Sequence, residues 1–149
     1  MGVRAAGPAV KAALALLAGA AILILLAVTP GGGARADDAR TASFTQAQAD
    51  QGGDLYRASC ASCHGPALND GEFAPPLKGV RFKSKWSGQP TGALFGYISA
   101  NMPPGQAGAL APDDYANILA FLLQANGVQA GQQPLPADPQ LLSGLGWPG

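Results

Sequence analysis

Every cysteine and histidine of this 149-residue chain lies within five consecutive positions, Cys60-Ala61-Ser62-Cys63-His64. This C-x-x-C-H spacing is the signal for covalent haem attachment. Two intervening residues allow the thiols to reach two vinyl groups on one porphyrin edge and form thioethers. The histidine directly follows the second cysteine, so its imidazole comes under the ring and binds the iron. The motif therefore predicts one covalently bound haem c with His64 as an iron ligand.

Three other uses of these residues are weaker. A disulfide between Cys60 and Cys63 could form in an oxidising compartment. A thioredoxin-like redox pair requires a βαβ context, which the sequence does not show. A structural zinc site requires four cysteine or histidine ligands, and this chain offers three. Together with the export signal described next, the motif favours haem attachment over all three.

The N-terminus has the layout of an export signal. Arg4 and Lys11 precede an apolar run from Ala12 to Val28, and the small-residue site Ala34-Arg35-Ala36 follows it. This order predicts a signal peptide over residues 1–36 and a periplasmic location for the mature chain. The alternative is an uncleaved membrane anchor, because the apolar run is near the lower length limit for a spanning helix.

Composition limits the core that the mature chain can build. The chain contains 21 glycines and 13 prolines, and much of its apolar content lies in the N-terminal run. A small domain of this kind usually needs a disulfide, a metal or a large cofactor to complete its core. All nine acidic residues follow Ala36, so the mature chain is acidic, with no reason to expect nucleic-acid binding.

Hydrophobic periodicity and capping residues predict three main helices. Thr45 and Gln48 form a capping box that begins a helix ending near Ser59. Gly52-Gly53 inside it indicates either a break or close packing against another helix. Apolar spacing predicts a helix over 91–100 and a longer one over 112–125. We expect residues 64–90 to be mostly loop and residues 128–149 to be an extended tail after a domain spanning 37–127.

The second iron ligand follows by elimination. Met1 lies in the signal and no second histidine exists, so a His/Met site must use Met102. The alternatives are a core methionine beside the haem, a vacant distal position, or a lysine ligand. The candidate lysines are Lys78, Lys83 and Lys85.

Four basic residues, Lys78, Arg81, Lys83 and Lys85, are concentrated just before Trp86. An ordinary solvated loop would explain them. In a second interpretation, Arg81 or Trp86 donates hydrogen bonds to the haem propionates. In a third, the lysines surround an exposed haem edge and steer an acidic partner. The alternating pattern suggests that Val80, Phe82 and Trp86 point inward and the charged residues outward.

From Phe44 to Gly127 the chain resembles class I cytochromes c. Gly52 and Phe121 match the crossing of that family's first and last helices, and Pro75-Pro76-Leu77-Lys78-Gly79 resembles its P-x-L-x-G segment. The resemblance implies that the Pro75 carbonyl accepts the proton of the ligating His64. It also implies an all-α fold around one haem. The faces of the haem would be packed by Leu68, Phe73, Leu77, Phe82, Leu94, Tyr97, Ile98 and Leu110.

A narrower resemblance links the chain to cytochrome subunits of periplasmic quinoprotein dehydrogenases. It rests on Trp86, on the segments Leu94–Ile98 and Asn101–Gly105, and on the helix before Asn126-Gly127. The resemblance implies a non-enzymatic, one-electron carrier between a dehydrogenase and a terminal oxidase or another cytochrome. A haem peroxidase and a redox or gas sensor are the alternatives. Against a peroxidase, the sequence offers no obvious distal acid or base. Against a sensor, it offers no room for an output domain.

Overall fold

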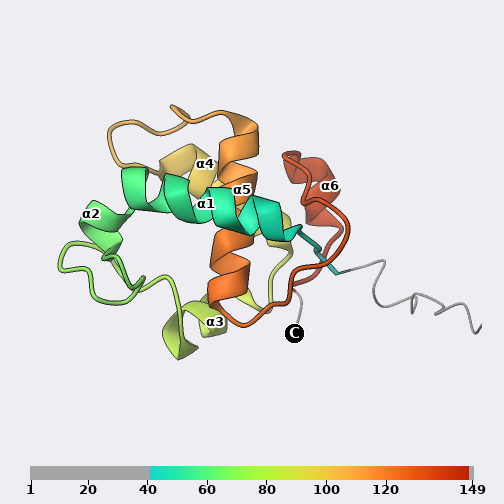
Figure 1. The fold of residues 1–149 in the computed structure, drawn as a ribbon, viewed down its shortest axis with the longest axis horizontal. Coiled ribbons are helices and arrows are strands. Elements are labelled where there is room, and N and C mark those ends of the chain that lie inside the picture. The colour runs from blue at the N-terminus through green and yellow to red at the C-terminus, as the bar shows by residue number, and fades with distance from the viewer. Residues whose placement is uncertain (1–40, 148–149) are drawn as a thin grey trace, which may run out of the picture. The chain divides into compact units, whose positions relative to one another are not determined.

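The computed structural model describes residues 41–147, so the predicted signal peptide and anchor lie outside the described residues. Within them the chain forms only helices and isolated bridges, which confirms the predicted all-α fold. None of these helices is long and apolar enough to cross a membrane. The helices (Figure 1) are α1 Gln46–Ser59, α2 Ala61–His64, α3 Val80–Trp86, α4 Thr91–Asn101, α5 Pro112–Ala125 and α6 Pro139–Ser143.

Helix α1 begins at the predicted capping box and crosses α5 at close range (Figure 1). The Gln48 amide donates to the Thr45 hydroxyl, and the Thr45 amide donates to the Gln48 side chain. A Cβ on Gly52 would stand 1.8 Å from the carbonyl oxygen of Asn117 on α5. The helix continues through Gly52, so close packing, and not a break, explains this glycine.

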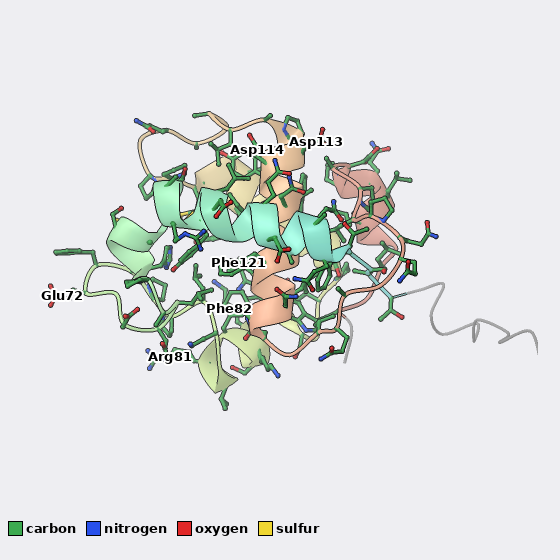
Figure 2. The ribbon with its side chains drawn as sticks, in the orientation of Figure 1. Glu72, Arg81, Phe82, Asp113, Asp114 and Phe121 are labelled. Carbon is green, nitrogen blue, oxygen red and sulfur yellow. The ribbon has the colours of Figure 1, made fainter. Side chains whose placement is uncertain are left out.

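Aromatic rings reinforce the same crossing. Phe121 lies on α5 where it meets α1 (Figure 2), and its ring centroid is 5.3 Å from that of Tyr56. A Cβ on Gly53 would touch the Phe121 ring at 3.4 Å. The structure therefore places Gly52 and Phe121 where the resemblance to class I cytochromes c put them.

Helix α5 is the centre of the core. Pro112 occupies its first turn, where a missing N–H costs nothing, and Asp113 and Asp114 stand at the positive end of its dipole (Figure 2). The apolar spacing that predicts this helix forms one stripe, which is buried throughout and consists of Tyr115, Ile118, Leu119 and Leu122. Asn126 ends the helix as predicted, and Gly127 follows with a φ of 97°.

Residues 64–90 are mostly loop, as predicted, but residues 80–86 within this range form the short helix α3, which the sequence analysis missed. Phe82 and Trp86 are buried one turn apart, whereas Val80 is 86% exposed. The alternating inward pattern predicted for Val80, Phe82 and Trp86 therefore fails at Val80. A helix places positions i and i+4 on one face, and position 80 lies off that face.

The extended tail predicted after residue 127 is also wrong, because this segment contains α6 and packs on the rest of the molecule. Asp138 caps α6, and Pro139 occupies its first turn. Leu135 and Leu142 are buried, and a Cβ on Gly92 of α4 would collide with the backbone of α6. The sequence analysis missed α6 because the segment is rich in proline and because single leucines, not a periodic apolar stripe, are buried in it.

Candidate haem-binding site

The C-x-x-C-H segment forms one helical turn directly after α1. Cys60 both ends α1 and precedes α2, and its carbonyl accepts from the His64 amide at 3.0 Å. Cys60 and Cys63 are half-buried free thiols, so the two cysteines are not joined as a disulfide. Burial, followed by the neighbouring Cys63, raises the pKa of the Cys60 thiol to about 11.

The imidazole of His64 is buried and oriented by a backbone carbonyl. Its Nδ1 lies 2.8 Å from the carbonyl oxygen of Pro75, as the resemblance implied. Because a carbonyl accepts only, Nδ1 carries the proton, and Nε2 is left with the lone pair that a metal requires. Two thiols and a pre-oriented imidazole within one turn form a donor set that fits a covalently attached haem.

The segment that carries Pro75 is held from two sides. The Leu77 amide donates to the Leu68 carbonyl at 2.7 Å. The buried side chain of Asn126 donates to the Leu77 carbonyl at 2.9 Å and accepts from the Gly79 amide at 3.1 Å. Sequence analysis identified Asn126 only as a helix stop, because nothing in its local pattern indicates a partner 47 residues away.

Tyr56 supports the other side of the same turn. Its buried hydroxyl donates to the carbonyl of Gly65, the residue after His64, at 2.6 Å. Burial raises the pKa of this phenol to about 12, with Cys60 and Asp70 as smaller causes. Sequence analysis missed this contact, although a tyrosine one turn before Cys60 on the buried face was a usable signal.

Met102 stands at the end of α4, as predicted, with extended backbone angles. Its side chain is half-buried, and its carbonyl accepts from the Tyr115 hydroxyl at 2.8 Å. The proline that follows disfavours helical angles at Met102, which is why α4 ends there. Ligation of iron by its thioether stays a prediction.

Arg81, Lys83, Lys85 and Trp86 lie on α3, whereas Lys78 is half-buried and precedes this helix. Arg81, Lys83 and Lys85 are exposed, and Figure 2 shows Arg81 beside α3 with Phe82 closer to α5. The Trp86 ring is buried, and its centroid lies 5.4 Å from the centroid of the Tyr97 ring. The ammonium of Lys85 lies 4.8 Å from the centroid of the Trp86 ring. The ammonium of Lys85 is thus held over an aromatic surface.

The residues predicted to pack the haem differ in exposure. Leu68, Phe82, Leu94 and Ile98 belong to the buried core, and Leu77 and Leu110 are partly buried against it. Phe73 and Tyr97 are exposed, at 81% and 41%. Their contact with the cofactor therefore remains a prediction.

An all-helical fold that presents a C-x-x-C-H turn with an oriented imidazole defines the class of c-type cytochromes. Residues 47–122, half of the chain, match the family described as "Cytochrome C oxidase, cbb3-type, subunit III", and the chain belongs to this family. It therefore binds haem c covalently and is an electron-transfer protein.

Two relatives agree with this assignment. The chain is 32% identical over 105 residues to cytochrome c-551 of Bacillus subtilis, covering 70% of this chain and 88% of the relative. It is 35% identical over 77 residues to the cytochrome bc1 complex cytochrome c subunit of Corynebacterium efficiens, covering 48% of this chain. The match spans 24% of that longer protein. No solved structure matches the chain significantly.

Proposed function

We propose that this chain is a mono-haem, one-electron carrier in a periplasmic electron-transfer chain. The observation that carries the proposal is the His64–Pro75 contact of 2.8 Å next to two free thiols. In this assignment Cys60 and Cys63 would form the thioethers, and the His64 imidazole and the Met102 thioether would hold the iron. When bound, the haem iron supplies a single electron by cycling between Fe(II) and Fe(III).

The proposed ligands favour a carrier over an enzyme. The Pro75 carbonyl fixes the orientation of the His64 ring, so this ligand needs no rearrangement during electron transfer. Met102 offers a soft, neutral thioether, which stabilises the reduced state and raises the potential. With His64 and Met102 both holding the iron, no position there would be left for a substrate.

We further propose that Arg81 and Trp86 donate hydrogen bonds to the haem propionates and so offset their charge. Support comes from their sequence position on α3 and from the burial of the Trp86 ring. Arg81 is exposed, so its side chain is accessible to an acidic group.

The electron donor that we propose is a dehydrogenase, with a terminal oxidase or another cytochrome as acceptor. Support for a quinoprotein dehydrogenase comes from the sequence resemblance, and support for a cytochrome partner comes from the relative named as a cytochrome bc1 complex cytochrome c subunit. Family membership indicates an exported protein, and we propose the periplasm as its location and residues 1–36 as its signal or anchor.

Optical spectra of the ferric and ferrous holoprotein, with and without carbon monoxide, test this function. A carrier gives a six-coordinate haem whose ferrous spectrum carbon monoxide leaves unchanged. Rapid binding of carbon monoxide by the wild-type protein would instead indicate a peroxidase or gas sensor.

The variant Met102→Ala tests the second ligand. We expect it to lose the red-end absorption band of methionine-ligated ferric haem, to have a lower potential and to gain peroxidase activity. An unchanged band and an unchanged potential would show that another group, such as a lysine, is the ligand.

A further inference from the structure

The loop after Met102 is tied to α5 by one buried phenol. Tyr115, in the first turns of α5, is 3% exposed. Its hydroxyl donates to the Met102 carbonyl at 2.8 Å and accepts from the Gly108 amide at 3.1 Å. One hydroxyl therefore joins both ends of the segment from Met102 to Gly108.

The other backbone bonds of this loop are local. The Gln106 amide donates to the Pro103 carbonyl, and the Ala109 amide donates to the Gln106 carbonyl. These bonds form turns within the loop but do not fix its position relative to α5. Gly105 and Gly108 have φ values of 80° and 73°, a region that glycine occupies without steric cost, so no side chain at these two positions packs the loop against α5.

Tyr115 is well placed to hold the loop because its own position is fixed. Pro112 begins the helix, and Tyr115 belongs to the same buried stripe as Ile118 and Leu119. A ring packed in the core has few accessible rotamers, so its hydroxyl is a rigid anchor. The Met102 amide in turn donates to the Ile98 carbonyl of α4, so the residue is anchored on both its amide and its carbonyl.

We propose that Tyr115 is the positioning residue for Met102: its hydroxyl holds the backbone of the distal ligand and restricts the loop from swinging away. The proposal rests on the proposed ligation by Met102. Loss of the hydroxyl leaves the ring packed but frees the Met102 carbonyl and the Gly108 amide. The loop then opens more often, and the ligand is displaced more easily.

The test compares the variant Tyr115→Phe with wild-type ferric holoprotein by titration with imidazole, an external iron ligand. Loss of these two hydrogen bonds predicts an apparent imidazole affinity that is higher by about tenfold. The methionine absorption band should persist without imidazole, because the thioether itself is unchanged. Hydrogen exchange at the Gly108 amide should accelerate by a similar factor.

The matched control is Thr91→Val, at the end of α4 opposite Met102. Thr91 is as buried as Tyr115, and its hydroxyl, which the variant removes, donates to the Gly146 carbonyl. This variant should lose stability without a change in imidazole affinity. If both variants raise the affinity equally, general destabilisation is the cause and the proposal is wrong. It is also wrong if Tyr115→Phe binds imidazole as the wild type does.

The outcomes separate this inference from the proposed function. A wild-type protein without the methionine band would contradict ligation by Met102. A wild-type protein with the band, and a Tyr115→Phe variant with unchanged affinity and unchanged Gly108 exchange, would contradict only the role of Tyr115.

Discussion

Gly52 of α1 lies against the Asn117 carbonyl of α5, with a distance of only 1.8 Å between that oxygen and the position of an ideal Cβ. Even the smallest side chain at position 52 would therefore force the two helices apart. The contact between the rings of buried Tyr56 and partly buried Phe121, at the same crossing, would be lost as well.

We expect Gly52→Ala to lower the free energy of unfolding by about 3 kcal/mol or more, because the clash involves backbone that cannot rotate away. Chemical denaturation of the holoprotein measures the change. The control is Gly96→Ala in α4, where no atom lies within 4 Å of the added Cβ. That variant should be neutral or more stable by up to about 1 kcal/mol. Equal effects at the two positions would contradict this account of the crossing.

We expect Asn126→Ala to lower the free energy of unfolding by about 2–4 kcal/mol. The variant loses the buried amide side chain and leaves the Gly79 amide and the Leu77 carbonyl without their hydrogen-bond partner. The control is Asn101→Ala, whose exposed amide donates to the Tyr97 carbonyl of its own helix. We expect a change below about 0.5 kcal/mol there. Denaturant titrations of both variants distinguish the two, and similar midpoints would argue against a special role for Asn126.

Two adjacent leucines test whether the segment after residue 127 is folded onto the core. Leu142 is fully buried and Leu141 is 61% exposed. Leu142→Ala should reduce the unfolding free energy by about 2–5 kcal/mol, whereas Leu141→Ala should change it little. Thermal unfolding of the two variants gives the comparison, and a stable Leu142→Ala protein would show that the tail contributes nothing.

The buried phenol of Tyr56 predicts a loss of stability in alkali. Its pKa is about 12 in the folded chain against 10.0 for the ordinary side chain, mainly because of burial. Between these values the unfolded chain has already released the proton that the folded chain still holds, so stability falls as the pH rises from 10 to 12. Tyr56→Phe should flatten this part of the profile. A profile of unfolding free energy against pH that is identical in both proteins would contradict the prediction.

The exposed cations of α3 predict salt-dependent electron transfer. Lys83→Glu combined with Lys85→Glu should slow the reaction with an acidic partner severalfold at low ionic strength and leave the midpoint potential nearly unchanged. Arg81→Ala should affect the potential more than the rate if Arg81 serves a propionate. Arg57→Glu is the control, since this cation lies on α1 and pairs with Asp54. Stopped-flow rates across a salt series should show no dependence on the α3 charges if the segment is only a solvated surface.

Local signals predicted a large part of the fold. The capping box of Thr45 and Gln48 and the stripe around Ile118 act within one or two turns, so α1 and α5 were found with their bounds. The C-x-x-C-H motif located the candidate site because all its donors are adjacent in sequence. Gly52 and Pro75 were placed by family resemblance, and the structure gives the contacts that explain both.

The remaining features depend on contacts that periodicity does not show. Helix α3 buries only Phe82 and Trp86, too few residues to distinguish a helix from an alternating strand pattern. Asn126 and Tyr115 act through single hydrogen bonds to distant or irregular backbone, which leave no repeat in the sequence. The tail was misjudged because its prolines stand at turns and at the start of α6, where they are compatible with folding.

The carbonyl of Gly146 accepts from the Ala42 amide, so the two ends of the described segment are joined. A chain is synthesised from its N-terminus, so Gly146 is made after every residue between it and Ala42. Contacts between such distant positions form late, because the intervening chain must first be brought into place. Until then the turn that carries Cys60 and Cys63 belongs to an unclosed chain. Closure of the described fold thus depends on the whole stretch of chain between Cys63 and Gly146.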